Sequence, residues 1–216
     1  MICAILLAAG SARRFGGEHK LLAAIPHEGT TAPLARVSVE RLLAADGIAE
    51  VIVVLGRDAE RVRDAIGHSE ATVTFFCNRD HETGMSSSLR EGVRAAQRHG
   101  DRLEGALVAL ADQPELRNDV VASIVETFER LPDGSRRDTI VVPRYAGAIG
   151  HPVLFGARVL PELLTVTGDR GGRIVVERDE ARVHPVDFAF TSPADIDTVD
   201  DLQSLLGRAR RRDEAR

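Results

Sequence analysis

The sequence is poor in several features that mark particular classes of protein. Its 216 residues include two cysteines, Cys3 and Cys77, and no CxxC or Cys/His spacing accompanies them. The absence of such spacing argues against a zinc site or a redox pair, so we interpret both cysteines as core residues. No apolar run is long enough to span a bilayer, and the apolar start lacks the basic flank of an export signal, so we expect a cytoplasmic protein without a membrane partner. The net charge of −5 is not the basic excess typical of nucleic-acid-binding proteins, and we expect no nucleic-acid partner.

Lysine is almost absent, because Lys20 is the only lysine among 28 lysines and arginines. It ends a glycine-containing loop that follows a short apolar run from Ile2 to Ala9, and such a run predicts a buried strand. The N–H groups of a glycine loop can converge on an anion, and Arg14 and Lys20 add positive charge. The loop therefore predicts a polyphosphate site. The alternative is that Lys20 is an ordinary surface residue.

Apolar strands alternate with amphipathic helices along most of the chain. The patterns predict strands at 51–55, 72–77, 105–111, 139–143, 153–155 and 183–186, a short extended piece at 21–24, and helices at 33–45, 58–66, 118–131, 174–177 and 199 to about 210. Strands separated by helices pair in parallel, so we expect one doubly wound α/β domain over residues 1–207. Residues 208–216 are expected to form a frayed tail.

A polar motif follows the expected strand at 72–77. Ser86, Ser87 and Ser88 begin a predicted helix after Asn78, where free N–H groups and hydroxyls could bind an anion or the edge of a base. A capping box between Ser87 or Ser88 and Glu91 is the equally weighted alternative.

Carboxylates and glycine loops mark the second half of the chain. Asp112 directly follows an apolar strand, at the position where open α/β sheets bind ligands, which favours a metal ligand over a turn former before Pro114. The glycine loops around His151 and Asp169 could close over an acceptor or be plain connections. Asp195 and Asp197 precede the last helix, where acidic residues normally serve as caps.

Several nucleotide chemistries are excluded by missing motifs. The first strand is not followed by GxGxxG or by a Walker A ending, and no cysteine or serine nucleophile is paired with a candidate base. Phosphoryl transfer without a covalent intermediate remains, and it needs positioning, a divalent metal held by carboxylates, and cations.

The ordered motifs resemble those of the MobA-like NTP transferase family, and within it the molybdenum cofactor cytidylyltransferase branch. The stretch from Leu7 to Gly10, with Arg14, Gly16 and Lys20, is similar to the LAAGxSxRxG…K signature. Further similar motifs are Asn78 with Gly84–Gly92, Leu110–Pro114, Gly150–Pro152, Gly168–Arg173 and Asp195–Thr198. Ala12 and Ala111 depart from the pattern, which often has serine and glycine there.

The resemblance implies a three-layer α/β/α Rossmann-like nucleotidyltransferase fold with a nucleotide-binding half, about 1–115, and an acceptor-binding half, about 116–207. It implies transfer of CMP from CTP to a molybdopterin phosphate, with Mg²⁺ or Mn²⁺ as cofactor and release of pyrophosphate. GTP or another phosphorylated acceptor is one alternative. A cofactor-binding chaperone for a molybdoenzyme apoprotein is the other.

The resemblance also assigns roles to residues. Lys20 and Arg14 would be catalytic, and Asp112 and Asp197 would hold the metal. The nucleotide would be bound by Leu7, Ala8, Ala9, Gly10, Arg14, Lys20, Asn78, Ser86, Ser87 and Ser88. The acceptor would be bound by Gln113, Gly150, His151 and Asp169.

Overall fold

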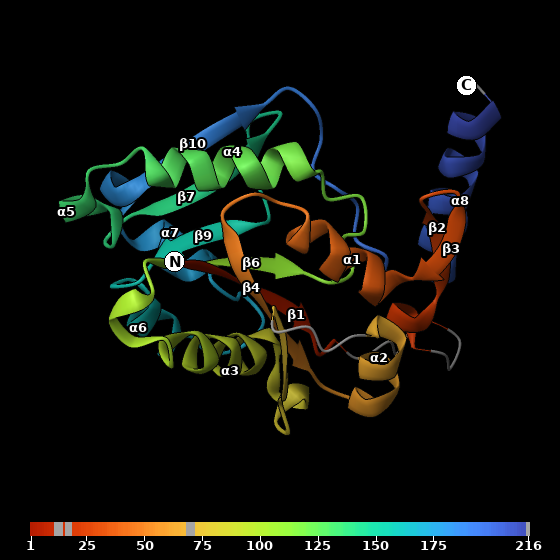
Figure 1. Cartoon of the computed structure of the whole chain (residues 1–216), viewed down its shortest axis with the longest axis horizontal. Helices are drawn as coiled ribbons and strands as arrows, with labels where there is room; N and C mark the ends of the chain where they lie inside the picture. The colour runs from red at the N-terminus through yellow and green to blue at the C-terminus, as the bar shows by residue number, and fades with distance from the viewer. Residues whose placement is uncertain (11–14, 16–18, 68–71, 215–216) are drawn as a thin grey trace.

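The computed structural model describes residues 1–10, 15, 19–67 and 72–214, with side chains as far as Arg211. Its centre is an eight-stranded sheet with strands in the order β10-β7-β9-β6-β1-β4-β5, and β8 pairs with β7 (Figure 1). The strands are β1 (Ile2–Ala8), β4 (Ile48–Leu55), β5 (Val73–Cys77), β6 (Gly105–Leu110), β7 (Ile140–Tyr145), β8 (Ala148–Ile149), β9 (Val153–Gly156) and β10 (Val183–Phe188).

Most of the sheet is parallel, as the alternating pattern predicted. β1 pairs in parallel with β4 and β6, β4 with β5, and β7 with β10. β9 is antiparallel to both of its neighbours, β6 and β7. The strand order reverses at β1, since the chain adds β4 and β5 on one side and β6 on the other. Open α/β sheets bind ligands at such a reversal, at the carboxyl ends of the strands.

Helices cover both faces of the sheet, giving the three layers expected (Figure 1). One face is covered by α1 (Leu34–Leu43), α2 (Ala59–Ile66) and α4 (Asn118–Glu129), and the other by α3 (Met85–Gln97), α6 (Leu160–Leu163) and α7 (Arg173–Arg178). Side chains of β1 alternate between the two cores, with Leu6 in the first and Ile5 in the second. Gly92 lets α3 approach the sheet, because a Cβ there would lie 2.3 Å from Ile5 Cγ2.

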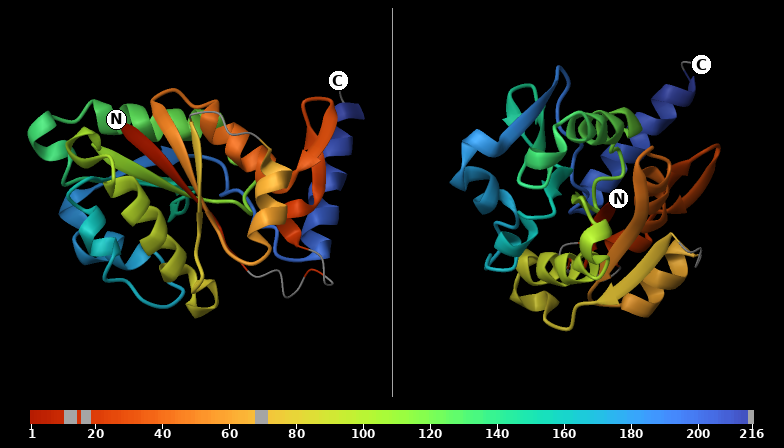
Figure 2. Two further views of the ribbon diagram at one scale, coloured as in Figure 1. Left: turned by 60° about the horizontal axis from the view of Figure 1, so that its bottom comes forward. Right: turned by 60° about the vertical axis from the view of Figure 1, so that its left-hand side comes forward.

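A hairpin and the last helix form one end of the molecule. β2 (Ala24–His27) and β3 (Thr30–Pro33) are joined at Glu28 and Gly29, both with positive φ, as a two-residue hairpin turn requires. α8 (Val199–Glu214) lies beside this hairpin (Figure 2). None of the helices in the described ranges has the length and apolar character needed to cross a membrane.

Shorter elements connect these pieces. They are the 3-10 turns η1 (Lys20–Leu22), η2 (His81–Thr83), η3 (Gly100–Arg102) and η4 (Glu180–Arg182), and the one-turn helix α5 (Asp133–Arg136).

Three local expectations were wrong, and a hairpin and two short helices were missed. Residues 20–22 form a 3-10 turn, because Ala23 N–H bonds back to the Lys20 carbonyl at 3.1 Å, and the extended strand begins at Ala24. The hairpin, α5 and α6 were not predicted. Cys77 is exposed, because it ends the edge strand β5. α8 continues to Glu214, and Arg208 in the supposed frayed tail pairs with Glu115 at 2.6 Å.

Candidate active site

A cavity of about 350 Å³ lies at the carboxyl ends of β1 and β6, next to the reversal in strand order. Eight of the residues assigned to the site from the sequence line it: Leu7, Ala8, Ala9, Gly10, Lys20, Ser88, Asp112 and Asp169. The rest of the lining is Leu21, His81, Glu82, Gly84, Met85 and Leu110, which sequence reasoning did not assign. Gly84, Met85 and Leu110 stand in motifs that the sequence analysis singled out, although no role was assigned to them, whereas Leu21, His81 and Glu82 belong to no motif.

Lys20 is held between two carboxylates from distant parts of the chain. Its Nζ donates to Asp112 Oδ2 at 2.8 Å and to Asp197 Oδ1 at 2.7 Å. Only 8% of the Lys20 side chain is exposed, against 24% for Asp112 and 55% for Asp197. Burial lowers the pKa of Lys20, but the two carboxylates outweigh it and the pKa is raised. Lys20 is therefore an ammonium ion at neutral pH.

The local chain explains how these three groups meet. Lys20 begins η1, and the buried Leu21 that follows fixes this turn to the core. Asp112 comes two residues after the end of β6. The segment carrying Asp197 is tied to the same strand end, because Ile196 is 1% exposed and its N–H donates to the Asp112 carbonyl at 2.9 Å.

Asp195 is a third carboxylate near this cluster. The buried Gln113 donates from Nε2 to Asp195 Oδ1 at 2.8 Å. Burial raises the pKa of Asp195, the Gln113 bond opposes this, and the charges of Asp112 and Asp197 raise it further. The stretch Asp195–Thr198 was the sequence signal for this group, but we interpreted only Asp197 as a ligand.

The serines at the start of α3 are held by their own chain. Asn78 Nδ2 donates to Ser87 Oγ at 2.7 Å and to Ser88 Oγ at 2.9 Å. The Ser87 hydroxyl points to the carbonyls of Gly84 at 2.8 Å and Asp80 at 3.0 Å. Of the three serines, only Ser88 lines the cavity.

The N–H groups at this helix start are not free, which corrects the expectation. Met85 N–H donates to Asp169 Oδ1 at 3.2 Å, and both the N–H and the hydroxyl of Ser86 donate to the Gly168 carbonyl. The capping box is also absent, since the helix follows Gly84 with no side-chain cap. Gly84 has φ of 110°, and a Cβ there would lie 2.6 Å from Asp169 Oδ1, so only glycine admits this contact.

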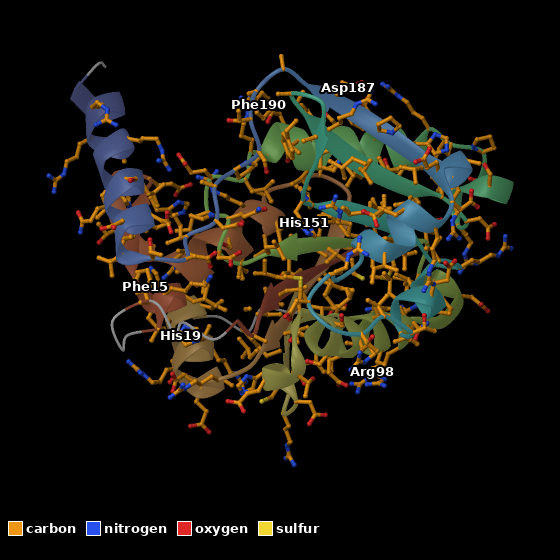
Figure 3. The ribbon with its side chains drawn as sticks, turned by 180° about the vertical axis from the view of Figure 1, so that it is seen from behind. Phe15, His19, Arg98, His151, Asp187 and Phe190 are labelled. Carbon is orange, nitrogen blue, oxygen red and sulfur yellow. The ribbon has the colours of Figure 1, made fainter. Side chains whose placement is uncertain are left out.

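The remaining acceptor-side residues lie beyond the cavity lining. His151 lies near the middle of the molecule beside β6 (Figure 3), and its Nδ1 is buried without a partner among the described residues. Burial lowers the pKa of His151, although a hydrogen bond with the Val108 backbone and the charges of Asp195 and Asp112 oppose this. The imidazole is therefore neutral at pH 7. Gly150 packs on the Tyr145 ring, because a Cβ built on Gly150 would lie 2.9 Å from the ring carbons Cδ2 and Cε2.

The donor set suits Mg²⁺ or Mn²⁺ bound together with a phosphate ligand. Such ions take carboxylate oxygens, and Mg²⁺ usually binds one or two carboxylates plus substrate phosphates. Asp112 and Asp197 supply two carboxylates with one ammonium between them. Across the described ranges there is no group of three or more His, Cys, Asp and Glu arranged to hold a metal alone. Arg14, the other predicted cation, lies outside the described residues.

Comparisons with known proteins identify the family of this chain. The MobA-like NTP transferase domain family matches residues 4–186. Among solved structures, Rv0371c from Mycobacterium tuberculosis H37Rv is 28% identical, covering 95% of this chain and 97% of that one with a TM-score of 0.76. The nucleotidyl transferase Mth528 from Methanothermobacter thermautotrophicus is 26% identical over 98% of both chains, with a TM-score of 0.75.

Two further structures bear on ligands. Another Rv0371c structure, 29% identical with a TM-score of 0.70 and covering 95% of this chain and 98% of that one, is a complex with manganese. A CMP:2-keto-3-deoxy-manno-octonic acid synthetase complexed with CTP is 12% identical with a TM-score of 0.70, covering 98% of this chain and 99% of that one, and shares the fold alone. No curated protein matches the chain. On the family match and the cavity at the β1 reversal, this chain belongs to the MobA-like NTP transferase family and is a nucleotidyltransferase.

Proposed function

We propose that this nucleotidyltransferase moves CMP from CTP to the phosphate of a molybdopterin-type cofactor in the cytoplasm. An oxygen of the acceptor phosphate would attack the α-phosphorus of CTP. The bond from that phosphorus to the bridging oxygen of the β-phosphate would break, and pyrophosphate would leave. The observation that carries the transfer step is the ammonium of Lys20 held by Asp112 and Asp197 at the cavity.

Each group in this cluster has a separate task. Lys20 would turn toward the α-phosphate and neutralise the negative charge that grows there during transfer. Asp112 and Asp197 would hold Mg²⁺ or Mn²⁺, which supplies charge neutralisation and orientation at the triphosphate. Arg14 and the backbone around Gly10 would bind the triphosphate, as the family resemblance implies.

The choice of CTP and of a molybdopterin acceptor is supported by the sequence motifs. The Asn78 and Ser86–Ser88 motif and the Gly150–Pro152 motif resemble those of the cytidylyltransferase branch. In this proposal Asn78 and the serines face the nucleoside. Ser88 is closest to it, because Ser88 lines the cavity. Gln113, Gly150 and His151 would shape the acceptor site together with Asp169, which contacts the start of α3 and lines the cavity.

A substrate panel tests the proposal. Wild-type protein and Lys20→Met are incubated with the molybdopterin cofactor, each of the four ribonucleoside triphosphates, and Mg²⁺ or Mn²⁺, and pyrophosphate release is measured. We expect cofactor-dependent release with CTP in the wild type and a large loss in the variant. Release with GTP alone would overturn the CTP assignment, and turnover of CTP with other phosphorylated acceptors only would overturn the cofactor.

The same variant, measured for cofactor binding and for maturation of a molybdoenzyme, separates an enzyme from a carrier. If the protein only delivered the cofactor to a molybdoenzyme apoprotein, Lys20→Met would bind the cofactor normally and support full maturation of that enzyme. We expect instead that the variant binds the cofactor, forms the cytidylylated product at least about 10²-fold more slowly and does not support full maturation.

A further inference from the structure

Asp201 lies in the first turn of α8 and collects three hydrogen bonds on one oxygen. Its Oδ2 accepts from the N–H of Asp197 at 3.1 Å, from the N–H of Thr198 at 2.8 Å, and from the Thr198 hydroxyl at 2.7 Å. In return, the N–H of Asp201 donates to Thr198 Oγ1 at 3.2 Å. Thr198 and Asp201 thus form the reciprocal capping box of this helix.

The bond to Asp197 is not part of that capping box. A capping box joins only the cap residue and the residue three positions on, which here are Thr198 and Asp201. Asp197 precedes the cap, and its N–H would otherwise face solvent at no cost to the helix. The additional bond therefore acts on the segment before the helix.

Asp197 depends on such a bond more than Asp112 does. Asp112 follows a buried central strand, whereas Asp197 belongs to a connecting segment and its side chain is 55% exposed. Backbone N–H groups on both sides of the Asp197 Cα are bonded. On its N-terminal side, Ile196 N–H donates to the Asp112 carbonyl and Asp197 N–H donates to Asp201; on the other side, Thr198 N–H donates to the same Asp201 oxygen. Between them they fix where the carboxylate meets Lys20.

We propose that Asp201 is a positioning residue that holds Asp197 against Lys20 and Asp112 through the Asp197 N–H group. The consequence for metal binding rests on the proposed function, in which Asp197 is a metal ligand. Groups that orient a metal ligand typically change metal affinity or activity about 10-fold to 100-fold when they are removed.

The neighbouring Asp200 provides a matched control. Both aspartates lie in the first turn of α8, so both contribute the same charge and a similar interaction with the helix dipole. Within the described part of the chain, Asp200 makes no side-chain hydrogen bond. Any difference between Asp200→Ala and Asp201→Ala therefore reports the bonds to Asp197 and Thr198, and Thr198→Ala separates capping from positioning.

The first measurement uses metal-free protein and does not depend on the proposed activity. Because Lys20 is the only lysine, tag-free protein labelled with ¹³C-lysine gives one ε-CH₂ signal, which reports the Lys20 environment. We expect Asp201→Ala to move this signal toward its position in Asp197→Ala. Asp200→Ala should leave the signal at its wild-type position. Asp201→Asn should also keep the signal near that position, because the amide oxygen can accept the same bonds.

The second measurement is the affinity for Mn²⁺ in the presence of CTP, by electron paramagnetic resonance of free Mn²⁺. We expect a loss of about tenfold for Asp201→Ala and less than twofold for Asp200→Ala, while Thr198→Ala lowers the unfolding temperature more than the affinity. If Asp201→Ala matches Asp200→Ala in the lysine spectrum, the proposal is overturned. If the lysine signal moves as expected but Asp197→Ala does not weaken Mn²⁺ binding, the positioning stands and the metal role of Asp197 fails. Circular dichroism and Asp201→Asn guard against an unfolded variant.

Discussion

The two walls of the cavity are built in opposite ways. On one wall, Lys20 and Asp112 line the cavity and form an ion pair, and Asp197, outside the lining, pairs with the same ammonium. On the other, the polar groups at the start of α3 bond to neighbouring backbone carbonyls and to Asn78. Ion pairs can exchange partners when a charged ligand arrives, whereas satisfied hydrogen bonds hold a fixed shape. We infer that the charged wall acts on the phosphates and that the serine wall is a preorganised surface for recognition.

The largest expected effect comes from removing the cation of the charged wall. Lys20→Met should lower kcat/KM by about 10²-fold or more, because the charge developing on the phosphates loses its neutralising partner. The same variant should bind Mn²⁺ more tightly without nucleotide, since Asp112 and Asp197 no longer share an ammonium. Steady-state kinetics and Mn²⁺ titration check both effects. A variant that is slow and also binds Mn²⁺ more weakly would contradict the exchange of partners.

The next effect concerns the backbone of the serine wall. Gly84→Ala should destabilise the fold by about 1–3 kcal/mol, because alanine rarely adopts φ of 110° and its Cβ would meet Asp169. Gly134→Ala is the control, since its Cβ meets nothing within 4 Å and its φ is unstrained. That change should be neutral or stabilise by up to about 1 kcal/mol. Urea unfolding measures both, and equal midpoints would show that the contact with Asp169 does not hold the wall.

Substitutions of two neighbouring serines should separate an effect on stability from an effect on nucleotide binding. Ser87→Ala should cost about 1–3 kcal/mol of stability, because the buried partners of its hydroxyl lose a bond. Ser88→Ala should cost less, because Asn78 keeps Ser87, but should raise the KM for the nucleotide about threefold to tenfold. Unfolding curves and KM values for CTP test the pair, and the reverse pattern would contradict the assignment of Ser88 to the nucleoside.

The smallest effect is a shift in titration. Since the pKa of Lys20 is raised in the folded protein, its contribution to stability is complete below about pH 10.4 and is lost as the pH rises through the folded value. The single lysine signal should therefore titrate above that value in the wild type. In Asp197→Asn the midpoint should fall. An unchanged midpoint would mean that the ion pair does not form in solution.

Much of the fold followed from the sequence because it depends on short-range pattern. The apolar runs of β1 and β6 and the helical spacing of α1 and α4 predicted a mostly parallel sheet. The place of the antiparallel β9 between β6 and β7 did not follow, since its pairing joins residues far apart in the chain. Cys77 was misplaced for a related reason, because an edge strand and a central strand share the same apolar pattern.

The site, like the fold, was predictable from the sequence only in part. Lys20, Asp112 and Asp197 could be assigned to one sheet edge, because each follows or approaches a strand end or carries a recognisable motif. Their direct pairing could not be predicted. The serines illustrate the opposite limit: the sequence suggests free N–H groups at the start of α3, but residues 168–169, more than 80 positions away, occupy those of Met85 and Ser86.

The most direct test of the central claim follows the α-phosphorus. Protein is mixed with the molybdopterin cofactor, Mg²⁺ or Mn²⁺, and CTP labelled with ³²P at either the α- or the γ-position. We predict that the α-label moves to the cofactor in the wild type, at least about 10²-fold more slowly in Lys20→Met, and that the γ-label leaves as pyrophosphate. Failure of α-labelled CTP to label the cofactor with either metal, or equal rates in the two proteins, would contradict the account.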